Sequence, residues 1–153
     1  MTISSQMQLD CFYLNSLVIK SKAIEQDSEF VEYGRNASIA FHVEKAVDAQ
    51  KYRVVLNVDV KPGNPSEDHL ENLTIELTGF FSFEKEMEKE EIDKYVPTLC
   101  LTNLLGIARG IIVQSTGMCH GGPILLPLVN INQVVKEYIQ RGVSDKMGKP
   151  ETD

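Results

Sequence analysis

Residues 51–61, KYRVVLNVDVK, carry the most regular two-residue repeat in the chain. One side of the repeat is entirely apolar or aromatic, and the other is mostly polar, with Arg53, Asn57 and Asp59. Because successive side chains of a β-strand point to opposite faces, this alternation predicts a strand with one buried face. Such strands are typical of antiparallel sheets that cover one face and leave the other in water.

Three further segments have the same character. Residues 7–22 are rich in β-formers, and the alternation breaks near Asn15, which predicts a bend or bulge. Residues 38–46 alternate and connect through the short segment 48–50 to the central strand, as in a hairpin. Residues 72–84 alternate again. Four consecutive strands with short connections predict an antiparallel sheet.

After residue 84 the apolar period changes from two to about 3.6, which is helical. The densely charged residues 84–94 are interpreted as a solvated connector, and Pro97 as the first residue of a long helix that ends before Gly117. A shorter helix is predicted between the N-cap Asn130 and Gly142. The fold class is therefore α+β, with both helices on one face of the sheet. We expect residues 1–142 to form a single domain and residues 143–153 to form a flexible polar tail.

The composition restricts the functions that this chain can have. It has 153 residues and a net charge of −7, and it has no basic cluster, which argues against nucleic acid and anionic membranes as partners. No signal peptide or membrane span is expected. The three cysteines are far apart in the sequence, which indicates a reducing compartment, and we expect the protein to be cytoplasmic.

No catalytic constellation is evident in the sequence. The Gly-rich segment 117–122 lacks the ending of a phosphate-binding loop and follows a helix instead of preceding one. Cys119 and His120 are adjacent, but neighbouring side chains on an extended chain usually point apart, and no third group is there to orient them. The three histidines lack the spacing of a metal site. We therefore expect no enzyme, no metal and no cofactor.

The chain has more apolar faces than one sheet and one covering helix require. The first strand is apolar on both sides, Phe80 lies on an otherwise polar face, and the second helix has its own apolar stripe. Large exposed apolar patches usually mark interfaces. The additional apolar surface predicts a homo-oligomer interface, a groove for apolar ligands or unfolded chains, or both.

Several segments resemble the SecB protein-export chaperone family, over about residues 7–142. The strongest block is CLTNLLGIARGII at residues 100–112, followed by a Gly-rich turn and PILLPLVNI at residues 123–131. GFFSF at residues 79–83 is similar to the end of the family's fourth strand, and KYRVVLNV at residues 51–58 to its third. The order and spacing of these segments make the resemblance more specific than any one of them.

The resemblance implies an ATP-independent holdase, a homotetramer built as a dimer of dimers, which binds unfolded preproteins for Sec-dependent export in apolar grooves. The groove would be lined from the second strand and both helices by Ile39, Phe41, Val43, Val113, Val135 and Ile139. The family also places an aromatic residue between the first two strands, for which Phe30 and Tyr33 are the candidates.

The resemblance supports the chaperone role better than it supports a partnership with the export motor. The family docks the motor ATPase SecA through acidic side chains on the exposed sheet face, whereas the matching first-strand positions here are Ser16 and Lys20. The matching fourth-strand position is Thr74, with Glu76 nearby. A non-export client, such as an antitoxin, therefore stays open. So do a non-catalytic scaffold subunit and a small-ligand enzyme with a cleft beside Cys119.

Overall fold

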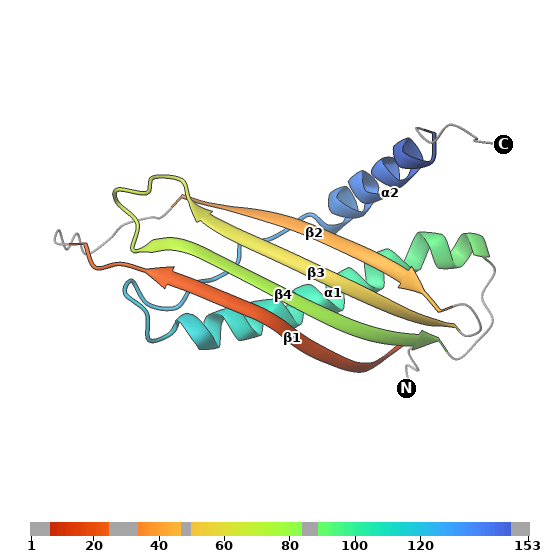
Figure 1. Cartoon of the computed structure of the whole chain (residues 1–153), viewed down its shortest axis with the longest axis horizontal. Helices are drawn as coiled ribbons and strands as arrows, with labels where there is room; N and C mark the ends of the chain where they lie inside the picture. Colours follow the sequence, from red (N-terminus) through yellow and green to blue (C-terminus); the bar gives the residue numbers. More distant parts are fainter. Residues whose placement is uncertain (1–6, 25–33, 47–49, 84–88, 148–153) are drawn as a thin grey trace, which may run out of the picture.

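The computed structural model describes residues 7–24, 34–46, 50–83 and 89–147, with the side chains of 89–94 and 142–147 left out. Four strands are followed by two helices. Their bounds are β1 Met7–Ser21, β2 Arg35–Lys45, β3 Lys51–Pro62, β4 Leu70–Phe83, α1 Lys89–Thr116 and α2 Ile131–Met147. The strands form one antiparallel sheet in the order β1-β4-β3-β2, which confirms the predicted α+β class. In Figure 1, α1 runs along one face of the sheet and α2 lies beyond the β2 edge.

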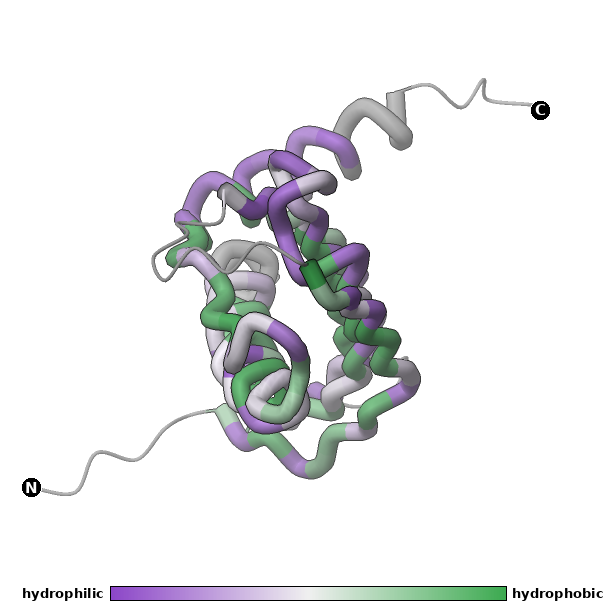
Figure 2. The backbone as a smooth tube through the Cα atoms, turned by 90° about the vertical axis from the view of Figure 1, so that its left-hand side faces the viewer, coloured by the Kyte–Doolittle hydropathy of each residue, from purple (hydrophilic) through white to green (hydrophobic). Residues whose placement is uncertain are grey.

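The core lies between α1 and the two central strands. The apolar side chains of β3 and β4 that face α1 are fully buried, and so is one face of α1, including Leu101, Leu104 and Leu105. Gly79 allows helix and sheet to approach closely, since a Cβ at this position would lie 2.8 Å from Leu104 Cδ2. Viewed along the sheet in Figure 2, α1 is seen nearly end-on beside the strands.

Strand β1 changes its alternation twice. Its pairing with β4 shifts register between Leu9 and Cys11 and again between Leu14 and Ser16. The second shift confirms the bulge predicted near Asn15, whose Nδ2 donates hydrogen bonds to Thr78 Oγ1 (2.7 Å) and Glu76 Oε2 (3.1 Å). The first shift was not predicted.

The two bulges explain why the sequence of β1 has apolar residues at both sets of alternating positions. Residues paired across neighbouring strands share a face, so the pairing of Phe12 with Gly79 and of Leu14 with Leu77 places both side chains on the α1 face. Tyr13 lies on the opposite face, where its ring packs edge-on against Phe80 at 6.0 Å. Phe12 and Leu14 are nevertheless 44% and 45% exposed, so α1 leaves this part of the sheet uncovered.

Both helices are longer than the sequence predicted. Helix α1 begins at Lys89, so Pro97 lies inside it instead of starting it, and part of the predicted connector is helical. Glutamate and lysine are good helix formers, so a densely charged segment can extend a helix whose later turns are anchored by packing. The 28 residues of α1 span about 42 Å. Helix α2 continues to Met147, past the Gly142 at which we expected its end.

Part of α1 is also apolar enough to pass for a membrane span. The segment Tyr95–Thr116 has a mean hydropathy of 1.6, although no span was expected from the sequence. Of this window, 44% is buried against the rest of the molecule. The core helix of a globular domain passes the same test of length and composition, so this feature is weak evidence for a membrane location.

Candidate functional site

Helix α2 is attached to the edge strand β2 through Tyr138. The Tyr138 ring stacks on the buried Phe41 ring, with centroids 4.4 Å apart and planes inclined by 29°. The backbone N–H of Val43 donates a long hydrogen bond, 3.4 Å, to the Tyr138 hydroxyl. Stacked aromatic pairs contribute about 0.5–1.5 kcal/mol beyond their buried area. This contact fixes α2 beside one end of β2.

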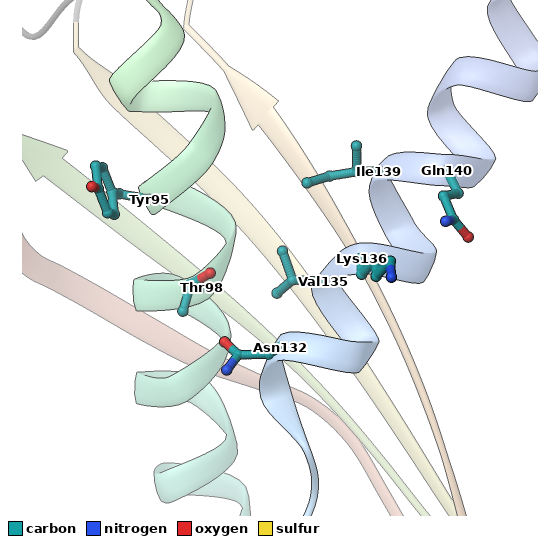
Figure 3. Close-up of a pocket in the computed structure, with 7 residues that line it drawn as sticks. All are labelled: Tyr95, Thr98, Asn132, Val135, Lys136, Ile139 and Gln140. Atoms are coloured by element: carbon teal, nitrogen blue, oxygen red, sulfur yellow. The ribbon is translucent and has the colours of Figure 1, made fainter.

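An open pocket of about 420 Å³ lies between α2 and the N-terminal half of α1. Figure 3 shows Tyr95 and Thr98 on α1, and Asn132 and Val135 on α2 with their side chains directed toward α1. The α2 side of the pocket is lined by Asn132, Val135, Lys136, Ile139 and Gln140. Tyr95 is 48% exposed and Ile139 is 45% exposed, so the pocket offers apolar surface to solvent.

Two of the predicted groove residues, Val135 and Ile139, line this pocket, and two others, Phe41 and Val43, contact Tyr138 on the same helix. Ile39, Phe41 and Val43 lie on β2 and pack against the core from its edge. On α2, Val135 is buried at the base of the pocket and Ile139 lies at its exposed side. Phe41 and Val43 therefore lie beside α2 at the β2–α2–α1 junction, where Val135 and Ile139 line the pocket, and none of the three β2 residues lines the pocket itself.

Two groups of predicted residues do not join this site in the described structure. Val113 is half-buried on α1 and does not line the pocket. Phe30 and Tyr33 lie outside the described residues. The sequence-based reading of the site missed Tyr95 because the residue falls before the expected helix start at Pro97. It missed Tyr138 as a site residue, although the apolar stripe of the second helix includes it.

The charge of the pocket differs from that of the chain. Lys136 is charged and no carboxylate is present among the seven lining residues, whereas the whole chain has a net charge of −7. In the part of the chain that the structure describes, Lys136 forms no ion pair. A bound segment would therefore meet amide, hydroxyl and ammonium groups around an apolar centre.

The exposed sheet face, opposite α1, holds the positions that the resemblance associates with SecA. Ser16 pairs with Glu76, and Lys20 pairs with Asn72. Glu76 accepts a hydrogen bond from Asn15, and Thr74 Oγ1 donates one to Asp59 Oδ1 at 3.1 Å. This face therefore carries a mixture of polar groups.

The cysteines and histidines are arranged differently from a thiol catalytic site. His120 stacks on His69, with ring centroids 6.1 Å apart, and within the described residues no hydrogen bond joins it to Cys119. Cys100 is buried in the core, and this burial raises the pKa of its thiol to about 12, so the thiolate nucleophile is scarce at neutral pH. Among the described side chains, no group of three His, Cys, Asp or Glu could hold a metal ion.

Comparison with solved structures places this arrangement in a known fold class, that of the SecB-like chaperones. The particular structure is that of Mycobacterium tuberculosis Rv1957, a SecB-like chaperone in complex with a ChAD peptide from the Rv1956 HigA1 antitoxin. It matches with a TM-score of 0.60 and 15% sequence identity, over 82% of this chain and 91% of that one. At this identity the likeness establishes the fold, and it confirms the resemblance found in the sequence at that level.

A second solved structure is more distant. It is a Streptococcus agalactiae protein of unknown function, which matches with a TM-score of 0.42 and 10% identity, over 82% of this chain and all of that one. No family model and no curated protein sequence matches the chain.

Proposed function

We propose that the protein is an ATP-independent chaperone that holds unfolded polypeptides on the apolar surface at the β2–α2–α1 junction. The observation that carries this proposal is the open pocket between α1 and α2, where Tyr95 and Ile139 remain about half exposed. No reaction is required of the residues there, and the protein acts without catalysis or a cofactor. We place it in the cytoplasm, as its unpaired cysteines suggest.

An apolar pocket suits unfolded clients for a physical reason. Unfolded chains expose apolar side chains without fixed geometry, and burial stabilises a complex by about 25 cal/mol per Å² whatever the sequence. Burying one large side chain therefore contributes about 1.5–3 kcal/mol before the cost of ordering the client. Several such contacts along an extended client are needed for stable binding, and we propose that Ile39, Phe41, Val43, Val113, Val135 and Ile139 supply them.

A client outside protein export is favoured over an export preprotein. Rv1957 is described in complex with a peptide from an antitoxin, and it shares the fold of this chain. The first-strand positions Ser16 and Lys20 also lack the acidic groups through which a SecA-type motor would dock. We therefore propose a non-export client such as an antitoxin, with preprotein delivery to SecA as the second candidate.

We further propose that the protein assembles into a homotetramer, a dimer of dimers. Phe12 and Leu14 lie on the α1 face of edge strand β1 yet are close to half exposed, and Leu99 on α1 is 41% exposed. A second copy that covers these side chains would remove apolar surface that the single chain leaves in water. The proposed function requires that the pocket between α1 and α2 stays open in such an assembly.

The deciding experiment combines aggregation and mass measurements. An unfolded, reduced test protein is diluted into buffer with increasing amounts of the chaperone and without nucleotide, and light scattering follows its aggregation. We expect suppression near one tetramer per client, together with a complex of tetramer plus client mass. Normal aggregation and no client binding would leave the scaffold interpretation, in which the protein's own assembly consumes its apolar surface.

A further inference from the structure

We infer that the free edge of β2 binds its client as an additional strand, so that backbone hydrogen bonds hold the client beside the apolar pocket. This inference rests on the proposed function and specifies the chemistry of the client: an extended segment with apolar residues at every second position.

The hydrogen bonds between β2 and β3 determine which backbone groups point outward. Ala46 N–H donates to Lys51 C=O at 2.9 Å at one end of the pairing, and Gly63 N–H donates to Gly34 C=O at the other. The register between β2 and β3 is regular throughout. Even-numbered residues of β2 therefore bond to β3, and odd-numbered residues direct their N–H and C=O groups away from the sheet.

The hydrogen bond at Val43 supports this assignment independently. Val43 is odd-numbered, and its N–H donates to the Tyr138 hydroxyl, which lies outside the sheet. Within the described residues, the outward backbone groups of Ala37, Ile39 and Phe41 have no hydrogen-bond partner. Among the described residues, 37–41 thus form a strand edge without a hydrogen-bonded neighbour, next to one position, Val43, that α2 already occupies.

The side chains of the same residues make this edge suitable for a client. Ala37, Ile39 and Phe41 pack their side chains against the core on the α1 side, whereas Ser38 and Ala40 are exposed on the opposite face. A strand added to β2 would place alternate side chains on these two faces. Apolar residues at every second position would then extend the apolar surface toward Val135 and Ile139, and polar residues between them would remain in water.

A single extended strand fits this edge better than a second copy of the chain. Figure 1 shows α2 beyond the edge of β2, and Tyr138 holds it there. A second copy paired antiparallel through residues 37–41 would have to fit its own α2 beside the start of this β2, whereas one strand needs only about 4.8 Å beside β2. The other edge strand, β1, offers the exposed Phe12 and Leu14 for self-association.

The test uses a short synthetic peptide, with valine and phenylalanine alternating with serine and lysine, and the full-length protein. Two derivatives carry N-methyl groups, one on the apolar residues and the other on the polar residues. An added strand directs only alternate N–H groups toward β2. We therefore expect one derivative to lose at least ten-fold in affinity by calorimetry, while the other stays within two-fold of the parent peptide. The sensitive set reports the strand direction: apolar residues for antiparallel addition and polar residues for parallel addition.

Amide exchange of the chaperone provides the second readout. Peptide binding should slow exchange at Ala37, Ile39 and Phe41, with little change at Ala40 and His42, which already bond to β3. Equal affinity of the two derivatives, or equal loss in both, would overturn strand addition while the chaperone function stands. Protection of the edge in the free protein would assign it to a second copy, which also overturns the inference. Failure of the parent peptide and of an unfolded protein to bind would overturn the proposed function itself.

Discussion

Phe41 and Tyr138 lie in stacked contact although 97 positions separate them in the chain, and this contact joins the edge of the sheet to the second helix. Tyr138 also accepts the hydrogen bond from Val43 N–H, so one side chain both packs on β2 and covers part of its edge. Since α2 also forms one wall of the pocket, the position of this helix links the apolar site to the strand beside it.

The aromatic contact should be measurable as a coupling energy. Phe41→Leu and Tyr138→Leu each remove one ring, and the double variant removes both. We expect a coupling of about 0.5–1.5 kcal/mol in the free energy of unfolding, from urea denaturation. Phe41→Leu combined with Tyr13→Leu, on the opposite edge strand, is the control pair and should be additive. Additivity of the Phe41 and Tyr138 variants would show that the stack does not hold α2 in solution.

Client affinity should depend on Ile139. Ile139 is about half exposed at the pocket, so Ile139→Ser should lower the free energy of unfolding by about 1 kcal/mol, which a folded domain tolerates. The lost apolar contact should weaken binding of an unfolded client about five-fold. This corresponds to about 1 kcal/mol, roughly half of the free energy that complete burial of such a side chain contributes. Fluorescence anisotropy with a labelled client measures this change.

Met118 provides the matched control for Ile139. It is fully exposed in the turn after α1, and it is not among the residues lining the pocket. Met118→Ser should leave client affinity unchanged. If both serine variants weaken client binding equally, the client binds exposed apolar side chains in general, and the pocket is not its specific binding site.

Stability should fall in acid because of a buried ion pair. Arg35 Nε and Nη2 donate to the two oxygens of Asp68 at 2.9 and 2.8 Å, and Asp68 is 2% exposed. Burial alone would raise the pKa of Asp68, but hydrogen bonds from Arg35 and from Leu70 N–H, with the positive charges nearby, lower it overall. A lowered pKa means that ionised Asp68 stabilises the fold above pH about 4, and that this contribution is lost as the pH falls further.

The variant Asp68→Asn isolates that contribution. It should lower the free energy of unfolding by about 3 kcal/mol at pH 7, since it leaves Arg35 without its carboxylate. The difference from the parent protein should shrink as the pH falls from about 4 toward 2. Glu67→Gln, at an exposed neighbouring position, should follow the parent profile. A difference that stays constant between pH 7 and 2 would contradict the assigned role of the charge.

The end of α1 should depend on one hydroxyl group. Thr116 is fully buried; its Oγ1 donates to Ile112 C=O at 2.6 Å and accepts from Ile124 N–H at 2.8 Å. Thr116→Val keeps the shape but leaves the Ile124 N–H without a partner, which should cost about 1–3 kcal/mol in thermal or urea unfolding. Ser115→Ala, at the exposed neighbouring position, should cost less than about 0.5 kcal/mol. Equal effects would show that water satisfies the Ile124 N–H.

The elements themselves could be predicted from the sequence because their signals are local. The alternation in residues 51–61 identified a strand, and the break near Asn15 in residues 7–22 identified a bulge. The change to a helical period identified both helices. The start of α1 could not be located in this way, because proline is favoured in a first helical turn and costly inside a helix, so the local signal at Pro97 pointed to the wrong position. The end of α2 beyond Gly142 was missed for a similar reason, because one glycine weakens a helix by only about 1 kcal/mol.

By itself, the sequence determined the fold class and the resemblance to SecB chaperones, because binary patterning and short motifs depend on neighbours along the chain. Only the tertiary structure decided that Tyr138 meets Phe41, that Tyr95 and Ile139 line one pocket, and which backbone groups of β2 face outward. These features depend on sheet register and helix placement, which join residues far apart in the chain. A periodic pattern states that a side chain is buried, but it does not state which distant side chain covers it.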